Sequence, residues 1–286
     1  MIVCENCRSI MKKAYGRMAR KEQVKFLRCP KCGLLWAPDL DIDMTFRSQL
    51  NEEKRQQALQ DARNKEFDNV LTLLKKILPP PRKGLEVGCS YGWFIEKASG
   101  VYEVEGIEAE DTVAQKARDK GLRVHTGLFP QDLPPECGKY DFIIFNNVWE
   151  HINHTTELID GCVKYLKKGG CLIITIPLST GAIYKISEWL ERFGRVKELA
   201  RLWQLHFHSP HIYYFNKKNI EQLMSKKGFK LVECKDIRSI DVNKMKERFE
   251  MDAEERHGGR KAAIFKLIYP VLKRMPADKA VFFFRI

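Results

Sequence analysis

The stretch 83–92, KGLEVGCSYG, has the residue types and the spacing of a ligand-binding turn. Gly88, Ser90 and Gly92 follow a short apolar segment, and residues 93–98 then favour a helix. A strand, a glycine turn and a helix in this order present backbone N–H groups and the positive end of the helix to a ligand. Glycine suits such a turn because it tolerates positive φ and has no Cβ to block a close approach. We therefore expect this turn to bind a cofactor or a substrate.

Three kinds of site share this spacing. In a hydrolase, Ser90 would be the nucleophile of a strand–turn–helix elbow. In a nicotinamide enzyme, Ser90 would replace the second glycine of a dinucleotide fingerprint. The next strand-like segment after the turn is 102–108, and its last residue is a further acid, Glu108. An acid there can accept hydrogen bonds from ribose hydroxyls. A hydrolase does not need it, so the turn and the acid together favour a cofactor that contains a nucleoside.

The elements around this turn alternate between strand and helix. We expect strands at 85–87, 102–108, 122–125, 140–145, 171–176, 229–234 and 280–285, and helices at 93–98, 112–120, 155–168 and 217–227. Strands that are separated by helices imply a parallel sheet with right-handed crossovers. A helical insert at 183–205 and a loop at 206–215 interrupt the alternation. The fold class is therefore α/β.

Two CxxC pairs near the start of the chain have the spacing of a zinc ribbon. The four cysteines are Cys4, Cys7, Cys29 and Cys32. Each CxxC forms a tight turn, and two such turns complete a tetrahedral thiolate site with no open position for chemistry. A redox function is less favoured because no βαβ unit surrounds either pair. We expect one structural zinc ion.

In this order, the motifs of the whole chain resemble the class I methyltransferases that use S-adenosyl-L-methionine (SAM), with an N-terminal zinc ribbon. The motifs that carry the resemblance are LEVGCSYG at 85–92, GIEA at 106–109, YDF at 140–142, WEH at 149–151, LKKGG at 166–170 and HIYYF at 211–215. The resemblance implies a Rossmann-like, mostly parallel seven-stranded sheet with helices on both faces. Ser90 stands where these enzymes more often have glycine.

The resemblance also implies which residues hold the cofactor. It places Glu86 at the methionine end of SAM, which distinguishes this family from nicotinamide enzymes, where an acid inside the first strand is unusual. We assign six residues to the SAM site: Glu86, Gly88, Ser90, Gly92, Glu108 and Asn146.

Methyl transfer from SAM needs an acceptor atom in line with the methyl group, and a hydroxyl or carbon acid also needs a base. His151 follows the fourth strand, at the sheet edge where open α/β folds bind ligands. We therefore choose His151 as the base, with His211 and Tyr214 as further catalytic candidates. Some O-methyltransferases hold a divalent ion with Glu-x-x-Glu-His. Here Asn147 replaces the first glutamate, so one carboxylate ligand is missing.

Charge is distributed unevenly along the chain. Residues 1–80 have a net charge of +6, residues 81–180 of −3 and residues 181–286 of +10. Basic flanks beside a slightly acidic core suit an anionic acceptor. We expect a small anionic metabolite, such as a sugar or a glycan or lipid precursor. The alternatives are an RNA methyltransferase, or a non-catalytic subunit that binds RNA or a partner through Trp189, Trp203 and Phe207.

The chain divides into four predicted regions. These are a zinc ribbon at 1–40, a linking helix at 41–80, the SAM-binding core at 81–240 with an insert at 180–215, and C-terminal helices with a final strand at 241–286. The amphipathic segment 262–273 is expected to pack against the sheet, with contact to a membrane surface as the alternative. Since no signal peptide or long apolar segment is recognisable, we expect a cytoplasmic protein.

Overall fold

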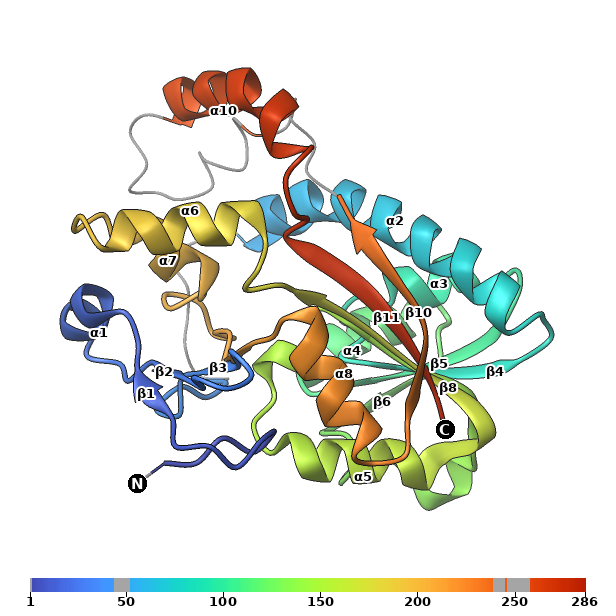
Figure 1. Ribbon diagram of the computed structural model, residues 1–286. Coiled ribbons are helices and arrows are strands. Elements are labelled where there is room, and N and C mark those ends of the chain that lie inside the picture. Colours follow the sequence, from blue (N-terminus) through green and yellow to red (C-terminus); the bar gives the residue numbers. More distant parts are fainter. Residues whose placement is uncertain (1, 44–51, 239–244, 246–257) are drawn as a thin grey trace.

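A computed structural model describes the whole chain except residues 1, 44–51, 239–244 and 246–257. Its centre is a seven-stranded sheet (Figure 1). The strands are β4 (Lys83–Val87), β5 (Glu103–Glu108), β6 (Val124–Thr126), β7 (Tyr140–Asn146), β8 (Leu166–Pro177), β10 (Lys230–Ile237) and β11 (Lys279–Arg285). Their order across the sheet is β10-β11-β8-β7-β4-β5-β6. The predicted α/β fold with seven strands is confirmed.

The order of the strands reverses direction at β4. Strand β4 pairs in parallel with β5 on one side and with β7 on the other. The connections on the two sides of β4 therefore run in opposite directions, the arrangement that in open α/β folds leaves a ligand-binding crevice at the carboxyl ends of such strands. Strand β11 lies between β8 and β10 and is antiparallel to both, so the sheet is mostly but not wholly parallel.

Both faces of the sheet are apolar, and helices cover each of them. Along β7, Phe142 and Ile144 belong to one hydrophobic cluster, whereas Ile143 and Phe145 belong to the other. This alternation buries both faces of the strand. The first face packs against α2 (Glu52–Ile77), α3 (Trp93–Ala98) and α4 (Asp111–Arg118), and the second packs against α5 (Thr155–Tyr165) and α8 (Lys217–Ser225). Figure 1 shows α2 and α5 on opposite sides of the sheet.

The N-terminal region forms a second, smaller sheet with a strand from far along the chain. Its order is β1 (Lys12–Lys13), β2 (Leu27–Arg28), β3 (Leu35–Trp36) and β9 (Tyr213–Tyr214), and helix α1 (Gly16–Glu22) lies between β1 and β2 in sequence. Strand β9 falls within 206–215, which was predicted as a loop. The prediction missed it because the strand exists only through pairing with β3, which lies near the other end of the chain.

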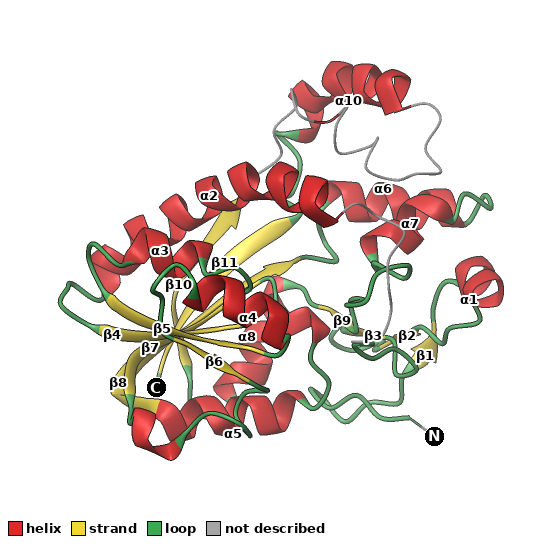
Figure 2. Cartoon of the chain, turned by 180° about the vertical axis from the view of Figure 1, so that it is seen from behind, coloured by secondary structure: helices red, strands yellow, loops and turns green. Residues whose placement is uncertain are grey.

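The helical insert packs against this smaller sheet. Helices α6 (Ala182–Glu191) and α7 (Lys197–Leu202) bring Tyr184 and Trp203 into a cluster with Tyr15, Phe26 and Tyr214. The Tyr15 and Tyr184 hydroxyls lie 2.7 Å apart. The insert therefore joins the N-terminal region to the core, and Figure 2 shows α1 and α7 on the same side of the molecule.

The predicted boundary between α5 and β8 was wrong. Helix α5 ends at Tyr165 instead of residue 168, and β8 begins at once with Leu166. Leu166 pairs with Tyr140 in β7, and the Gly169 N–H donates to the carbonyl of Ile286, the last residue. These partners are distant in sequence, so local helix propensity could not reveal that this segment continues into the sheet.

Three further elements complete the described chain. They are the short 3₁₀ helices η1 (Pro135–Cys137) and η2 (Trp149–His151), and helix α10 (Gly258–Leu272). Among the residues that the structure describes, no helix has the length and apolar composition needed to cross a bilayer.

Candidate functional site

The turn between β4 and α3 has the backbone conformation that its sequence predicts. Gly88, Ser90 and Gly92 have φ values of 67°, 50° and 73°, all in the left-handed region. A Cβ on Gly88 would lie 2.6 Å from a methyl carbon of Val148. On Gly92 it would lie 2.3 Å from a methyl carbon of Leu122. Both glycines are therefore required by backbone conformation and by packing within the protein, in addition to any ligand.

Glu108 lies directly beside this turn. Its carboxylate accepts hydrogen bonds from the Ser90 N–H at 2.8 Å and from the Glu110 N–H at 3.2 Å. Burial raises the pKa of Glu108 above its usual value. The acid predicted to bind a ribose thus also orders the turn, since it holds Ser90 in place.

Glu86 and Asn146 form a pair at the floor of the crevice. The Asn146 side-chain amide donates to one Glu86 oxygen at 2.8 Å. The other oxygen is buried and has no hydrogen-bond partner in the described part of the chain. Burial raises the pKa of Glu86 to about 8. A buried carboxylate with an unsatisfied oxygen is costly, and a cationic amino group is the partner that relieves the cost.

These observations test whether the site fits SAM. The turn, Glu108 and the Glu86–Asn146 pair lie at the carboxyl ends of the three adjacent strands β4, β5 and β7. SAM carries an α-amino group, a ribose and a nucleobase. The unsatisfied Glu86 oxygen suits the first of these groups and Glu108 suits the second. The residues present therefore fit the cofactor.

We expect Glu108→Ala to weaken SAM binding by ~1–3 kcal/mol, roughly 5- to 150-fold in Kd, because it removes the acceptor for the ribose hydroxyls. Isothermal titration calorimetry measures this directly. The matched control is Glu103→Ala, which changes an exposed glutamate at the opposite end of the same strand. Unchanged SAM affinity in Glu108→Ala would contradict the ribose contact.

His151 lies at the end of η2, just past the carboxyl end of β7, and its ring is mostly buried. Its Nδ1 is 2.8 Å from the Pro210 carbonyl oxygen and 2.9 Å from the Ser209 hydroxyl. Since a carbonyl can only accept, Nδ1 carries the proton. The lone pair of the neutral ring is therefore on Nε2, the atom that could accept a proton.

His211 packs edge-on against His151, with ring centroids 4.7 Å apart. Burial, together with His151, lowers the pKa of His211 well below its usual value, so this imidazole is neutral. Its Nε2 contacts the Gln204 side-chain amide at 2.8 Å, whereas Nδ1 is buried with no hydrogen-bond partner among the described residues. The two histidines, predicted separately from distant positions in the sequence, thus share one site.

Glu150 completes a cluster with the two histidines. One candidate ligand atom from each of the three residues lies within 4.8 Å of the others. Burial raises the pKa of Glu150 to about 8, with Lys279 and Arg63 acting in the opposite direction. The neighbouring Asn147 side chain donates to Glu66 at 3.4 Å and supplies no carboxylate. The cluster therefore lacks the first carboxylate of the Glu-x-x-Glu-His motif, because Asn147 stands in its place.

Tyr214, the third catalytic candidate, lies in the wall of this site. Its hydroxyl donates to the Leu202 carbonyl at 2.7 Å, and its ring contacts His211 at a centroid distance of 5.2 Å. Burial raises the pKa of this phenol well above its usual value. In this arrangement Tyr214 supports His211 by packing.

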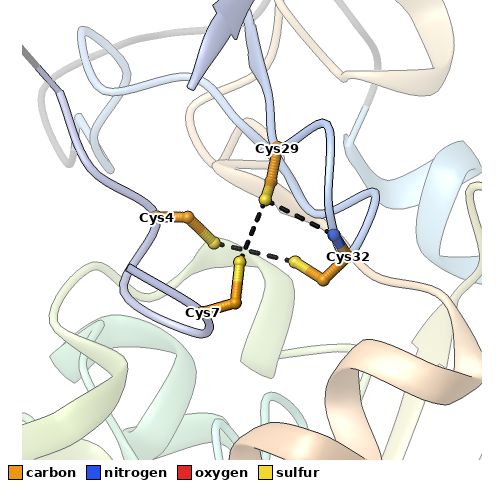
Figure 3. A group of neighbouring side chains, drawn as sticks. All are labelled: Cys4, Cys7, Cys29 and Cys32. Atoms are coloured by element: carbon orange, nitrogen blue, oxygen red, sulfur yellow. Dashed lines mark hydrogen bonds between the residues drawn. The ribbon is translucent and has the colours of Figure 1, made fainter. Parts of the chain in front are cut away.

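The four cysteines of the N-terminal region converge on one point (Figure 3). The Cys4 and Cys32 sulfurs are 3.7 Å apart, and the Cys7 and Cys29 sulfurs are 3.2 Å apart. A tetrahedral zinc ion with Zn–S bonds of about 2.3 Å needs sulfurs ~3.8 Å apart. The Cys32 N–H also donates to the Cys29 sulfur at 3.4 Å, which stabilises a thiolate. The residues present fit zinc.

Three charged residues of the crevice were not predicted from the sequence. Lys279 pairs with Glu66 at 2.6 Å, and Arg63 influences the ionisation of both Glu86 and Glu150. No local motif marks them, because they come from α2 and from β11, which adjoin the crevice only in the folded chain. Their approach to the site therefore could not be predicted.

The aromatic residues proposed for stacking on RNA bases are not equally available. Trp203 is fully buried and packs edge-on against Phe26 at a centroid distance of 4.9 Å. It therefore belongs to the hydrophobic core and cannot stack on a base. Trp189 is exposed and contacts Phe193.

Comparisons with known proteins agree with this geometry. The methyltransferase-domain family model matches residues 52–234. A SAM-dependent methyltransferase from Thermotoga maritima has a TM-score of 0.51 at 19% identity, covering 82% of this chain and 95% of its own. The cyclopropane synthase MmaA2 from Mycobacterium tuberculosis has a TM-score of 0.53 at 18% identity. This match covers 86% of this chain and 90% of that one.

A third similar structure contains the cofactor. It is phosphoethanolamine N-methyltransferase 2 from Haemonchus contortus in complex with S-adenosyl-L-methionine, with a TM-score of 0.52 at 18% identity, covering 77% of this chain and 52% of that one. At these identities the structures establish the shared fold. The family match covers more than half of the chain, including the glycine turn, Glu108 and the Glu86–Asn146 pair. The chain therefore belongs to the class I SAM-dependent methyltransferases.

Proposed function

We propose that this protein transfers the SAM methyl group to a hydroxyl or carbon acid of a small anionic metabolite, with His151 as the base that removes the proton. The observation that carries the proposal is the His151–His211 pair beyond the carboxyl end of β7. SAM supplies an activated methyl group. The protein's part is to position the acceptor and take its proton.

The enclosure around the two histidines favours a small acceptor. The Ile212 N–H donates to the Glu150 carbonyl at 2.8 Å, and the Ala37 N–H donates to the Ile212 carbonyl at 2.9 Å. The segment after α7 and the N-terminal region therefore both close over η2. A folded nucleic acid or protein would have to displace these contacts, whereas a small molecule would not.

The net charge of the chain supports an anionic acceptor: residues 1–80 carry +6 and residues 181–286 carry +10. Lys279 and Arg63 both lie close enough to the buried carboxylates of the crevice to affect their ionisation. Lys279 already pairs with Glu66 at 2.6 Å, so the support comes from the basic flanks of the chain. A sugar phosphate, a nucleotide sugar or the head group of a glycan or lipid precursor has the required charge.

Incubation with radiolabelled SAM and a cell extract, separated afterwards into anionic small-molecule, lipid and RNA fractions, tests the proposal. We expect label in the anionic small-molecule or lipid fraction and none with Gly88→Val, the inactive control. Label that appears only in RNA would contradict the proposal and favour the alternative of an RNA methyltransferase.

A further inference from the structure

Helix α10 exposes one apolar face. Ile264, Leu267, Ile268 and Val271 are 61%, 80%, 41% and 62% exposed, and Met275 follows one turn later. The spacing i, i+3, i+4, i+7 places these side chains on one side of a helix. Figures 1 and 2 show α10 at the periphery of the molecule, away from the sheet. The expectation that 262–273 packs against the sheet is therefore wrong for this face.

The side of the helix next to this face is more buried. Leu272 is buried, and Phe265 and Tyr269 are partly buried, with ring centroids 5.9 Å apart. The side opposite the aliphatic face is exposed as well, and Lys266 and Lys273 lie on it. The aliphatic face and the basic side chains are therefore both accessible from outside the molecule.

Positive charge accompanies this apolar face. Residues 258–277 contain five Lys or Arg and no Asp or Glu. Arg260, Lys266, Lys273 and Arg274 are all exposed, and they lie near both ends and in the middle of the helix. An apolar face combined with cations and without acids is the pattern of a helix that lies in the interface of an anionic bilayer.

A second copy of the chain is a weaker candidate for the occupant. A helix of 15 residues is about 22 Å long, so its face offers roughly 250 Å², well below the ~800 Å² per partner of a stable dimer. Two copies packed through α10 would also bring like charges together. Neither objection applies to anionic lipid.

We infer that α10 is an interfacial helix that binds the protein reversibly to anionic phospholipid surfaces. Its aliphatic side chains enter the boundary between head groups and acyl chains, and its Lys and Arg side chains contact lipid phosphates. This inference does not depend on the identity of the methyl acceptor. It implies that the enzyme works at a membrane surface even when the acceptor itself is in solution.

Co-sedimentation with sucrose-loaded vesicles tests the inference. One set contains phosphatidylcholine with about 30% phosphatidylglycerol, and the other contains phosphatidylcholine alone. We expect the protein to bind the anionic vesicles at least tenfold more tightly, and high salt to reduce that binding. No sedimentation with the anionic vesicles would overturn the inference.

Two variants distinguish vesicle binding through α10 from binding through the overall positive charge of the protein. The double variant Leu267→Glu, Val271→Glu should reduce vesicle binding at least tenfold, because it places carboxylates on the apolar face. The matched control is Val232→Glu on β10, an aliphatic residue that is 44% exposed, and it should bind as the wild type does. Equal loss in both variants would contradict a specific role for α10.

Sedimentation equilibrium of the same proteins tests whether a second copy of the chain, and not lipid, covers the aliphatic face of α10. We expect a wild-type mass that the double variant leaves unchanged. A wild-type dimer that the double variant converts to monomer would assign the face to self-association and would overturn the inference. Circular dichroism of each variant tests whether it is folded.

Discussion

Replacing His151 by alanine should lower kcat by ~10²–10⁴-fold while SAM affinity stays within roughly threefold, as expected for the loss of a general base. The hydrogen bond from Nδ1 to the Pro210 carbonyl places the lone pair on Nε2. The residue follows β7, on the far side of β4 from the Glu108 turn at the end of β5. Its loss should therefore affect turnover and spare the cofactor. Steady-state kinetics together with calorimetry separate these two effects.

Two further measurements make this prediction specific. His151→Gln keeps a hydrogen-bonding side chain but removes the base, so its kcat should remain low. Thermal unfolding shows whether the contacts of His151 with Ser209 and Pro210 are needed for folding. Full activity in a folded His151→Ala protein would contradict the role of base and leave His211 and Tyr214 as the candidates.

A metal ion at Glu150, His151 and His211 would give a different result. Added Mn²⁺ or Mg²⁺ would then raise the wild-type kcat, and His151→Ala would lose that response. We expect no response to either ion. The reason is that Asn147 has an amide at the position where a metal site of this kind has a carboxylate. Divalent ions with oxygen ligands favour carboxylates.

Cys29→Ser should remove one zinc equivalent per chain and destabilise the protein by at least ~3 kcal/mol, a fall in Tm of roughly 6–12 °C for a protein of this size. A zinc ion on the four cysteines would hold the turn at Cys32, whose carbonyl accepts from the Asn216 side chain at 3.0 Å and from Asn219 at 3.3 Å. Both asparagines begin α8. The metal site is therefore connected to the core as well as to the smaller sheet.

The matched control is Cys234→Ser, which changes a partly buried free thiol outside the cluster and should keep both zinc and stability. Inductively coupled plasma mass spectrometry and differential scanning fluorimetry measure the two quantities. Cys29→Ser should also lower methyl transfer, because β3 holds β9 beside the histidine site. Wild-type protein that folds without zinc would contradict the metal assignment.

The parts of the site that local sequence predicts are those made by consecutive residues. Gly88, Ser90 and Gly92 form one turn, and Glu108 is fixed beside them by a single strand–helix–strand unit. The spacing of the CxxC pairs likewise predicts a cluster, because each pair bends tightly by itself. In such segments the chemistry depends on near neighbours, which a sequence records directly.

The rest depends on pairing between distant segments. Strand β9 exists because it pairs with β3, and that pairing places His211 against His151. Lys279 enters the crevice because β11 inserts between β8 and β10. The outward face of α10 could not be predicted, because its period-3.6 pattern suits a helix that packs and one that does not. Only the folded chain distinguishes the two.

Calorimetric titration of the wild-type protein with SAM, and separately with NADH, tests the central claim most directly. We predict one SAM site per chain and no heat from NADH. Gly88→Val should abolish SAM binding, because valine resists a φ of 67° and its Cβ would lie 2.6 Å from Val148. Binding of NADH by the wild-type protein, with no response to SAM, would contradict the assignment of this crevice.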